Sequence, residues 1–339
     1  MDYCFASDNT VGAHPTVLAA LVAADAGTEK SYGADSASAT ALEEIRRVFG
    51  DHAEAALVTT GTAANVLGLA HVLRPHEAVI APSVAHLVND ESTAPGTFGV
   101  NLLPVPTSDG KLRPADFAPY LATVGDEHSP QPRVASITQA TELGLVYSVD
   151  EVRALADAAH ANGMLLHMDG ARIANAVAAL DVSARTAVTE AGVDLLSLGL
   201  TKIGGLEAEA IVVLKPGLSA GLTYTVKRGM QLVSKGRLIG AQVAALLADD
   251  LWLQNARHAN AMAARLSTEL AALPGVALAR PTEASGVFVL LPPAVQAAMA
   301  EEFAFYPWQA NPGEYRLMCS WKTTDAQIDA VVARAASAC

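Results

Sequence analysis

Residues 148–172, SVDEVRALADAAHANGMLLHMDGAR, decide the fold class. Ser148 and Glu151 form a capping box, which predicts that a helix begins at about residue 149. The helix should continue to about residue 162, because Gly163 is placed to stop it. The nearly continuous apolar run at 164–169 then predicts a strand that is buried on both faces. A helix followed by such a strand is the repeating unit of α/β proteins.

The same alternation of short apolar runs and helical patterns fills the first two hundred residues. The helix predicted at 62–73 has Val66, Leu67, Ala70 and Leu73 on one face. Strands are predicted at 55–60, 78–81, 101–105, 133–138, 164–169 and 193–198. Together they predict a mostly parallel sheet covered by helices on both faces. In such sheets ligands bind beyond the carboxyl ends of the strands.

The pattern changes after about residue 236. A long helical stretch rich in Ala and Leu, at 236–273, is followed by short strands at 286–291 and 314–319. Thr324 and Gln327 form a capping box for a final helix. We therefore expect a smaller α+β domain. The predicted organisation is an N-terminal segment at 1–14, a large domain at 15–240 and a small domain at 241–339.

Composition narrows the classes of function. The 339 residues suffice for two domains with a core in each. The net charge of −13, without any run of Lys or Arg, argues against nucleic acid and anionic membrane as partners. Three scattered cysteines suit neither a disulfide framework nor a zinc site, and no transmembrane run or export signal is present. These features predict a cytoplasmic protein. An anionic substrate would need local Arg residues, because the overall charge repels it.

Lys202 is the first candidate for chemistry. It follows the apolar run at 193–198 and precedes Gly204 and Gly205, so it should lie where a strand opens into a cleft. An amine there can condense with an aldehyde if its surroundings lower its pKa enough to supply the neutral form. The alternative is a solvated loop lysine, which is the commoner state of a lysine considered alone.

Asp169 and Arg172 make a reactive role of Lys202 more plausible than a solvated loop position. Asp169 ends another apolar strand, 33 residues before Lys202. A carboxylate aimed into the cleft can keep the pyridine nitrogen of pyridoxal 5′-phosphate (PLP) protonated, which makes the ring an electron sink. Arg172 is within reach of the phenolic oxygen of that ring or of a substrate carboxylate. The alternative is Asp169 as a helix N-cap with Arg172 as a surface partner. Asp and Lys at two strand ends favour the cofactor interpretation.

Two further features fit a bound PLP. The turn at 59–62, TTGT, joins a strand to a helix, and its backbone N–H groups with Gly61 and Thr62 suit a phosphate. The alternative is an ordinary helix cap. His86 follows another strand, where an imidazole can stack on the ring and transfer protons. Its alternative is a structural histidine that caps a loop.

Taken together, these motifs resemble the threonine aldolase family of fold-type-I PLP enzymes, within the β-eliminating lyase superfamily. The similar segments run in the same order along most of the chain. They are residues 7–15 (SDNTVGAHP), 32–35 (YGAD), 60–62 (TGT), 85–86 (AH), 167–172 (HMDGAR), 201–202 (TK) and 208–210 (AEA). Residues 138–142 (TQATE) are typical of the low-specificity L-threonine aldolase branch, whereas other branches have a Glu-Asn-Thr-His-type segment there.

The resemblance implies an α/β fold like that of aspartate aminotransferase and a role for each matching residue. Lys202 would hold PLP as a Schiff base beside Thr201, Asp169 would pair with the pyridine nitrogen, and His86 would stack on the ring. Other cofactor contacts are implied for Gly61, Thr62, Arg172 and Arg228. Substrate contacts are implied for Ser7, Arg172 and Arg316, and for Tyr32, which would reach a neighbouring subunit's site. Family members are usually homotetramers built from dimers that share active sites.

The implied activity is retro-aldol cleavage of L-threonine, L-allo-threonine and related β-hydroxy-α-amino acids to glycine and an aldehyde, without a metal. His86 is a candidate base for the β-hydroxyl proton. His128 is the candidate match for a family histidine that handles this hydroxyl. The alternatives are β-elimination or transamination on the same scaffold, or a PLP-binding protein without catalysis.

Leu200, Ile203 and Glu207 depart from the family pattern around the lysine. Family members commonly have a small residue, a polar residue and Gly, respectively, at these positions. The departures leave the attachment of PLP to Lys202 intact, but they can change the shape of the pocket around it.

Overall fold

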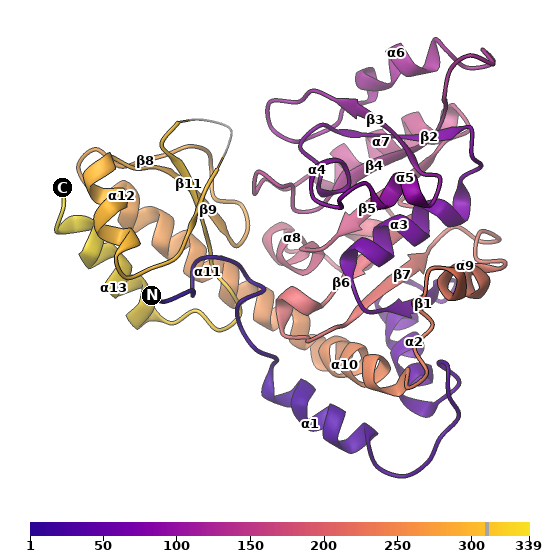
Figure 1. Ribbon diagram of the computed structural model, residues 1–339, viewed down its shortest axis with the longest axis horizontal. Coiled ribbons are helices and arrows are strands. Elements are labelled where there is room, and N and C mark those ends of the chain that lie inside the picture. The colour runs from indigo at the N-terminus through magenta and orange to yellow at the C-terminus, as the bar shows by residue number, and fades with distance from the viewer. Residues whose placement is uncertain (309–311) are drawn as a thin grey trace.

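The computed structural model describes residues 1–308 and 312–339 and, within them, places a seven-stranded sheet at the centre of the larger part of the chain (Figure 1). The strand order is β1-β7-β6-β5-β4-β2-β3. In chain order the strands are β1 (Glu54–Val58), β2 (Glu77–Pro82), β3 (Asn101–Val105), β4 (Gln131–Thr138), β5 (Leu165–Gly170), β6 (Leu195–Gly199) and β7 (Glu209–Val213). The predicted α/β class with a mostly parallel sheet is confirmed.

β7 is the strand that the periodicity analysis did not predict, and it is antiparallel to both of its neighbours, β6 and β1. The pairs β2–β3, β2–β4, β4–β5 and β5–β6 are parallel. An antiparallel return needs no crossover helix, so the short connection at 200–208 is enough to join β6 to β7. That connection carries Lys202.

Helices cover both faces of this sheet (Figure 1). They are α1 (Pro15–Ala24), α2 (Ser36–Phe49), α3 (Gly61–Val72), α4 (His86–Asn89), α5 (Ala94–Thr97), α6 (Ala118–Leu121), α7 (Val149–Ala161), α8 (Ile173–Leu180), α9 (Leu222–Arg228) and α10 (Arg237–Leu247). Short 3₁₀ or π turns lie at η1 (Pro114–Phe117), η2 (Arg185–Thr189), η3 (Thr201–Ile203) and η4 (Ala248–Asp250).

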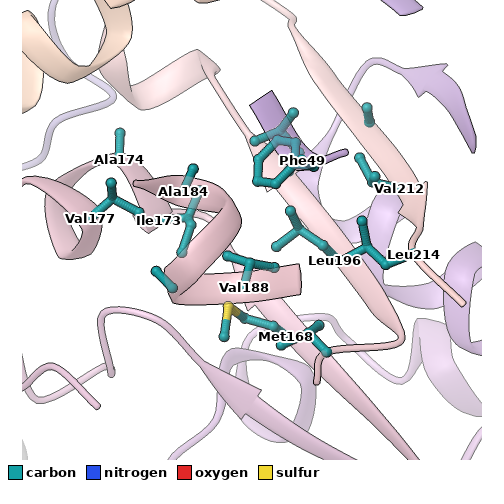
Figure 2. Packing of buried hydrophobic residues seen from close by; sticks show 14 of the residues in the cluster. Phe49, Met168, Ile173, Ala174, Val177, Ala184, Val188, Leu196, Val212 and Leu214 are labelled. Atoms are coloured by element: carbon teal, nitrogen blue, oxygen red, sulfur yellow. The ribbon is translucent and has the colours of Figure 1, made fainter. Parts of the chain in front are cut away.

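The two faces have separate cores because successive strand residues point in opposite directions. Leu196 and Val212 face α2 and α8, in the cluster that contains Phe49 and Ile173 (Figure 2). The neighbouring residue Leu195 belongs instead to the cluster under α3 and α9. Because both faces of the strands are buried, their sequences are nearly continuous apolar runs.

The predicted caps are confirmed. Ser148 Oγ accepts from Glu151 N at 3.1 Å, and Glu151 Oε2 accepts from Ser148 N at 2.7 Å. α7 ends at Ala161, just before Gly163, which has a φ of 68°. β1 ends at residue 58 rather than 60 because Thr60 serves as the N-cap of α3.

The predicted helical stretch at 236–273 is two helices, α10 and α11 (Leu251–Ala271). Asp249 and Asp250 both have positive φ values, 51° and 55°, which end one helix and start the next. Sequence periodicity did not show this break, because short polar residues can adopt the left-handed conformation without Gly. The predicted domain boundary at residue 240 falls inside α10, and we propose the break at 248–250 as the boundary instead.

The smaller part of the described chain contains a four-stranded antiparallel sheet of order β10-β11-β9-β8, packed against α11. Its elements are β8 (Ala277–Leu278), β9 (Gly286–Leu290), α12 (Pro293–Ala300), β10 (Tyr306–Pro307), β11 (Glu314–Met318) and α13 (Asp325–Ala336). Thr324 and Gln327 form the predicted capping box of α13. The N-terminal segment joins this part, since Met318 N donates to Phe5 O at 2.9 Å.

Close packing of α2 on α10 generates the first prediction. A Cβ on Gly240 would lie 2.6 Å from Ser38 N and 2.7 Å from Ser38 Cα, so the two helix backbones would have to separate. Gly240→Ala should therefore lower the free energy of unfolding by about 1–3 kcal/mol, measured by urea titration. The matched control is Gly96→Ala, also in a helix, where no atom of the described residues lies within 4 Å of the added Cβ. Equal effects of the two substitutions would contradict the packing argument.

Candidate active site

Two adjoining cavities lie beyond the carboxyl ends of β4, β5 and β6. The inner cavity has a volume of about 320 Å³, and Thr138, Asp169 and Lys202 contribute to its lining from these three strand ends. The outer cavity has a volume of about 360 Å³ and extends to the small sheet, where Phe288 and Arg316 line it. The side chains that line both are Asn9, His86, Ala140, Glu142, Arg172 and Lys202.

Lys202 occupies the turn η3 directly after β6. Burial lowers the pKa of its amine, and the nearby Arg172 guanidinium lowers it further. The carboxylates of Asp8, Asp169 and Glu209 act in the opposite direction. The net shift is downward, so the neutral amine needed to attack an aldehyde is easier to form than on a solvated lysine.

Asp169 ends β5 with its side chain buried in the inner cavity. Its Oδ2 accepts from Asn65 Nδ2 at 2.7 Å, and its Oδ1 accepts from Ala171 N at 2.9 Å. Two donors hold this carboxylate in one orientation. Asn65 was not predicted as a site residue, although it lies one turn after the TTGT segment at the start of α3.

His86 lies at the first turn of α4 and lines both cavities. Its Nδ1 is 3.1 Å from Glu91 Oε1, and this hydrogen bond raises the pKa of the imidazole despite its partial burial. Glu91 Oε1 also accepts from Asn65 Nδ2 at 2.9 Å. A polar chain therefore runs from His86 through Glu91 and Asn65 to Asp169.

The N-terminus of α3 forms another wall of the inner cavity. Thr60 Oγ1 accepts from Ala63 N at 3.1 Å, and the structure gives the amides of Gly61 and Thr62 no partner within residues 1–308 and 312–339. A Cβ at Gly61 would have Glu209 Oε2 as its nearest neighbour, at 3.9 Å. Burial raises the pKa of Glu209 to about 7, so at neutral pH it opposes an anion less than a full carboxylate would.

Arg172 is fixed by Asp8. Arg172 Nε and Nη2 donate to the two oxygens of Asp8 at 2.7 and 2.9 Å. The Arg172 guanidinium holds the pKa of the Asp8 carboxyl below its ordinary value, even though burial acts in the opposite direction. Asp8 thus ties the N-terminal segment to the site and leaves the remaining N–H groups of Arg172 for a ligand. Sequence analysis did not assign Asp8 a role.

Arg316 approaches the outer cavity from β11. Its guanidinium carbon lies 4.7 Å from the centre of the Trp308 ring and 5.8 Å from that of Tyr306. Burial, reinforced by Arg172, lowers the pKa of Arg316 to about 10. Arg316 Nε is buried without a hydrogen-bond partner among the described residues. The arginine is therefore well placed to bind an anion, together with Ser7, which also lines this cavity.

Three of the candidates lie outside both cavities. His128 precedes β4 and is therefore at the opposite end of the sheet from Lys202, with 86% of its side chain exposed. The structure does not bring His128 to the site of its own chain. Arg228, at the end of α9, is exposed. Tyr32 is also exposed, and its ring centre lies 5.3 Å from Lys227 Nζ.

The three departures from the family pattern have different positions. Leu200 and Ile203 are buried in the main core and line neither cavity, so they leave the shape of the site unchanged. Glu207 does line the inner cavity. Apolar neighbours of Lys202 therefore fix η3 against the core while the amine faces the cavity.

Comparison with known proteins decides the family. Residues 5–292 match the beta-eliminating lyase family. The chain belongs to this family. It is 40% identical to the low specificity L-threonine aldolase of Pseudomonas sp. (strain NCIMB 10558), over 96% of this chain and 94% of that protein. It is 41% identical to a Pseudomonas aeruginosa protein of the same name, over 94% and 93% of the two chains.

Solved structures agree with this assignment. Leishmania major threonine aldolase superimposes with a TM-score of 0.93 at 30% identity, over 98% of both chains. Aspartate aminotransferase from Rhizobium meliloti has a TM-score of 0.71 at 15% identity, over 100% of this chain and 91% of that one. The second likeness shows the fold alone. The predicted fold type and family are both confirmed.

Enzymes of the beta-eliminating lyase family depend on PLP, and the inner cavity fits that cofactor. The free amides at Gly61 and Thr62 suit the phosphate group. The buried carboxylate of Asp169 suits a protonated pyridine nitrogen, and the amine of Lys202 suits the aldehyde. The three groups line one cavity, so a single ligand can meet all of them.

The Asp8–Arg172 pair generates the second prediction. The exposed fractions of these side chains are 4% and 20%, so Asp8→Asn leaves a mostly buried cation without its counter-charge. We expect this lyase to lose about 3 kcal/mol of unfolding free energy in urea titrations at fixed cofactor concentration.

The control is Asp150→Asn, which breaks a pair with Arg153 whose side chains are 92% and 46% exposed. Solvent screens such pairs, so its effect should stay below about 1 kcal/mol. A loss at Asp8 no larger than that at Asp150 would show that the buried pair does not stabilise the fold.

Proposed function

We propose that this lyase cleaves L-threonine, L-allo-threonine and related β-hydroxy-α-amino acids to glycine and an aldehyde. The observation that carries the proposal is that Lys202 and Arg172 line both cavities. An amino acid in the outer cavity can thus present its amine to the cofactor position while arginines hold its carboxylate. The names of the Pseudomonas and Leishmania relatives support the same reaction.

Bound PLP supplies an electron sink for the pair of electrons that a breaking bond leaves on Cα. The residues of the inner cavity would bind PLP and keep its ring able to accept these electrons. Lys202 would bind the aldehyde carbon covalently, and Asp169, oriented by Asn65 and Ala171, would keep the pyridine nitrogen protonated. His86 would contact the ring, and Gly61, Thr62 and Thr201 complete the lining of the inner cavity.

Arg172, Arg316 and Ser7 determine which bond of the substrate breaks. Charge-assisted arginine–carboxylate contacts fix the carboxylate, and with the amine also fixed only one rotation about the amine–Cα bond remains. Holding the carboxylate in the outer cavity would thus select the Cα–Cβ bond for cleavage. The substrate is a zwitterion without net charge, so these local cations act on its carboxylate alone, within a chain whose own net charge is −13.

Lys202→Ala generates the third prediction. Without the amine, the purified protein should lose the visible absorbance of the covalently bound cofactor and nearly all release of glycine and acetaldehyde from L-threonine. Absorbance spectra and product assays check both effects. Lys215→Ala is the control and should keep both properties, because Lys215 lies at the other end of the sheet and contacts Asp194 at 3.4 Å. A Lys202→Ala protein with normal spectrum and turnover would overturn the assignment.

Product analysis separates the aldolase from the alternatives. Glycine with acetaldehyde identifies retro-aldol cleavage, whereas ammonia with a keto acid identifies β-elimination. A transaminase would need a keto-acid acceptor, and a protein without catalysis would show the bound-cofactor spectrum alone. Rates on the four threonine stereoisomers define the preference between threonine and allo-threonine.

We also infer an oligomer with shared sites, a homotetramer made of two dimers, in the cytoplasm. Tyr224 and Met230, on and next to α9, are 80% and 83% exposed, which favours a covered surface in an assembly. Arg228 and Tyr32 line neither the inner nor the outer cavity of their own chain, which is consistent with contacts to a partner's site. Within the described residues, none of the helices combines the length and apolarity needed to cross a membrane.

A subunit-mixing experiment provides the fourth prediction. Lys202→Ala and Arg228→Ala should each lose activity alone, the second through weak PLP binding. After dissociation and reassembly together, a mixed dimer pairs an intact Lys202 with the partner's intact Arg228, so activity should return. Absence of recovery in mixtures that form hybrid oligomers would place Arg228 outside the shared site.

A further inference from the structure

Glu142 is a buried carboxyl that the roles assigned above do not use. It belongs to the segment that follows β4 and lines both the inner and the outer cavity. It therefore lies at the boundary between the cofactor position and the substrate position. In the sequence this glutamate ends the TQATE segment at 138–142, which is typical of the low-specificity branch, and no role was predicted for it.

Hydrogen bonds fix one oxygen of Glu142 and leave the other free. Oε1 accepts from His86 N and from Thr138 Oγ1, both at 2.8 Å. Oε2 is buried and has no hydrogen-bond partner among the described residues. An unpaired buried carboxyl oxygen is costly, so a substrate hydroxyl that enters the site would supply a partner that residues 1–308 and 312–339 do not.

Burial raises the pKa of Glu142 to about 7, and the negative charge of Asp169 adds to this effect. The donors at Oε1 act in the opposite direction. A general base is most effective when its pKa lies near the working pH, and an ordinary solvated glutamate is too weak a base for that. The titratable and charged groups of the described residues that line the same two cavities or interact with Glu142 are His86, Asp90, Tyr147, Asp169, Arg172, Lys202, Glu207, Glu209, Tyr306 and Arg316.

Two of these groups are rival bases. His86 is held by Glu91, which raises its pKa, and the proposed function already assigns its ring to a contact with the cofactor. Glu209 also has a pKa of about 7, but it lies at the phosphate end of the inner cavity and does not line the outer one. Glu142 alone among the three combines a free oxygen with a position on the substrate side.

We propose that Glu142 is the catalytic residue that takes the β-hydroxyl proton of the substrate, an inference that rests on the proposed aldolase function. As the O–H proton passes to Oε2, the hydroxyl oxygen forms the carbonyl of the leaving aldehyde and the Cα–Cβ bond breaks. The electron pair of that bond stays on Cα until a proton restores neutral glycine. No metal or redox partner enters this balance.

Glu142→Gln tests the proposal, because the amide keeps an oxygen acceptor for His86 N and Thr138 but cannot take a proton. Two rates are compared in the PLP-loaded enzyme: aldehyde release from L-threonine, and exchange of the α-hydrogen of glycine in deuterium oxide. The first should fall by about 10²–10⁴-fold. The second should stay close to the wild-type rate, because glycine has no β-hydroxyl.

The pH profile gives an independent readout. In the wild type, kcat/KM for aldehyde release should rise as the pH increases through about 7, since the base must be the carboxylate. The residual activity of Glu142→Gln should lack this rise. If the rise persists, Glu209 or His86 is responsible and the proposal is overturned.

Glu283→Gln is the matched control. Glu283 Oε2 accepts from Val146 N at 2.7 Å but lines neither cavity, so both rates should be unchanged. Equal loss of both rates in Glu142→Gln with a normal cofactor spectrum would overturn the proposal in favour of a structural role. If Glu142→Gln binds no cofactor, Glu142→Asp tests the proposal instead. Its shorter side chain keeps a carboxyl, so kcat/KM for aldehyde release must still rise with pH, and a flat profile would overturn the proposal. A wild type that releases no aldehyde would instead refute the proposed function.

Discussion

The close approach of the ends of β5 and β6 is the constraint on which the site depends. A Cβ on Gly170 would lie 2.7 Å from Ser197 O, and one on Gly199 would lie 2.7 Å from Ala171 Cα and 3.0 Å from Gly170 O. Only glycine fits at either position without moving the backbone. Because these strands also pair in parallel, with Asp169 opposite Ser197, Asp169 and Lys202 emerge at the same edge of the sheet. The two ends of one cofactor can then be held by neighbouring strands.

Charge balance in a buried space follows from that arrangement. Lys202, Arg172 and Arg316 are brought close together, and burial and mutual repulsion lower the pKa values of Lys202 and Arg316. Asp8 offsets part of this charge by a two-point contact with Arg172. Asp169 stays fixed by Asn65, whereas Glu142 and Glu209 have pKa values of about 7. The site can therefore hold charged ligands and still contain a carboxyl that exchanges a proton near neutral pH.

Sequence predicted the elements whose pattern is local. The capping box at Ser148 and Glu151, the apolar strands and the strand-end positions of Asp169 and Lys202 all follow from spacing within a few residues. Contacts between residues far apart in the sequence leave no local pattern. For this reason β7 and the contacts of Asp8 with Arg172 and of Asn65 with Asp169 were not predicted. His128 was proposed from a resemblance in a Pro-rich segment. That segment leads into the amino end of β4, which is at the opposite edge of the sheet from Lys202. Glu142 lies at the other end of the same strand.

Borohydride reduction followed by peptide mapping tests the central claim most directly. Reduction converts the link between a lysine amine and PLP into a stable bond, so the labelled peptide identifies the lysine without any assay of turnover. The structure predicts a single phosphopyridoxyl group on the peptide that contains Lys202. A label on another lysine, such as Lys215 or Lys227, or no label in protein that has bound PLP, would contradict the account.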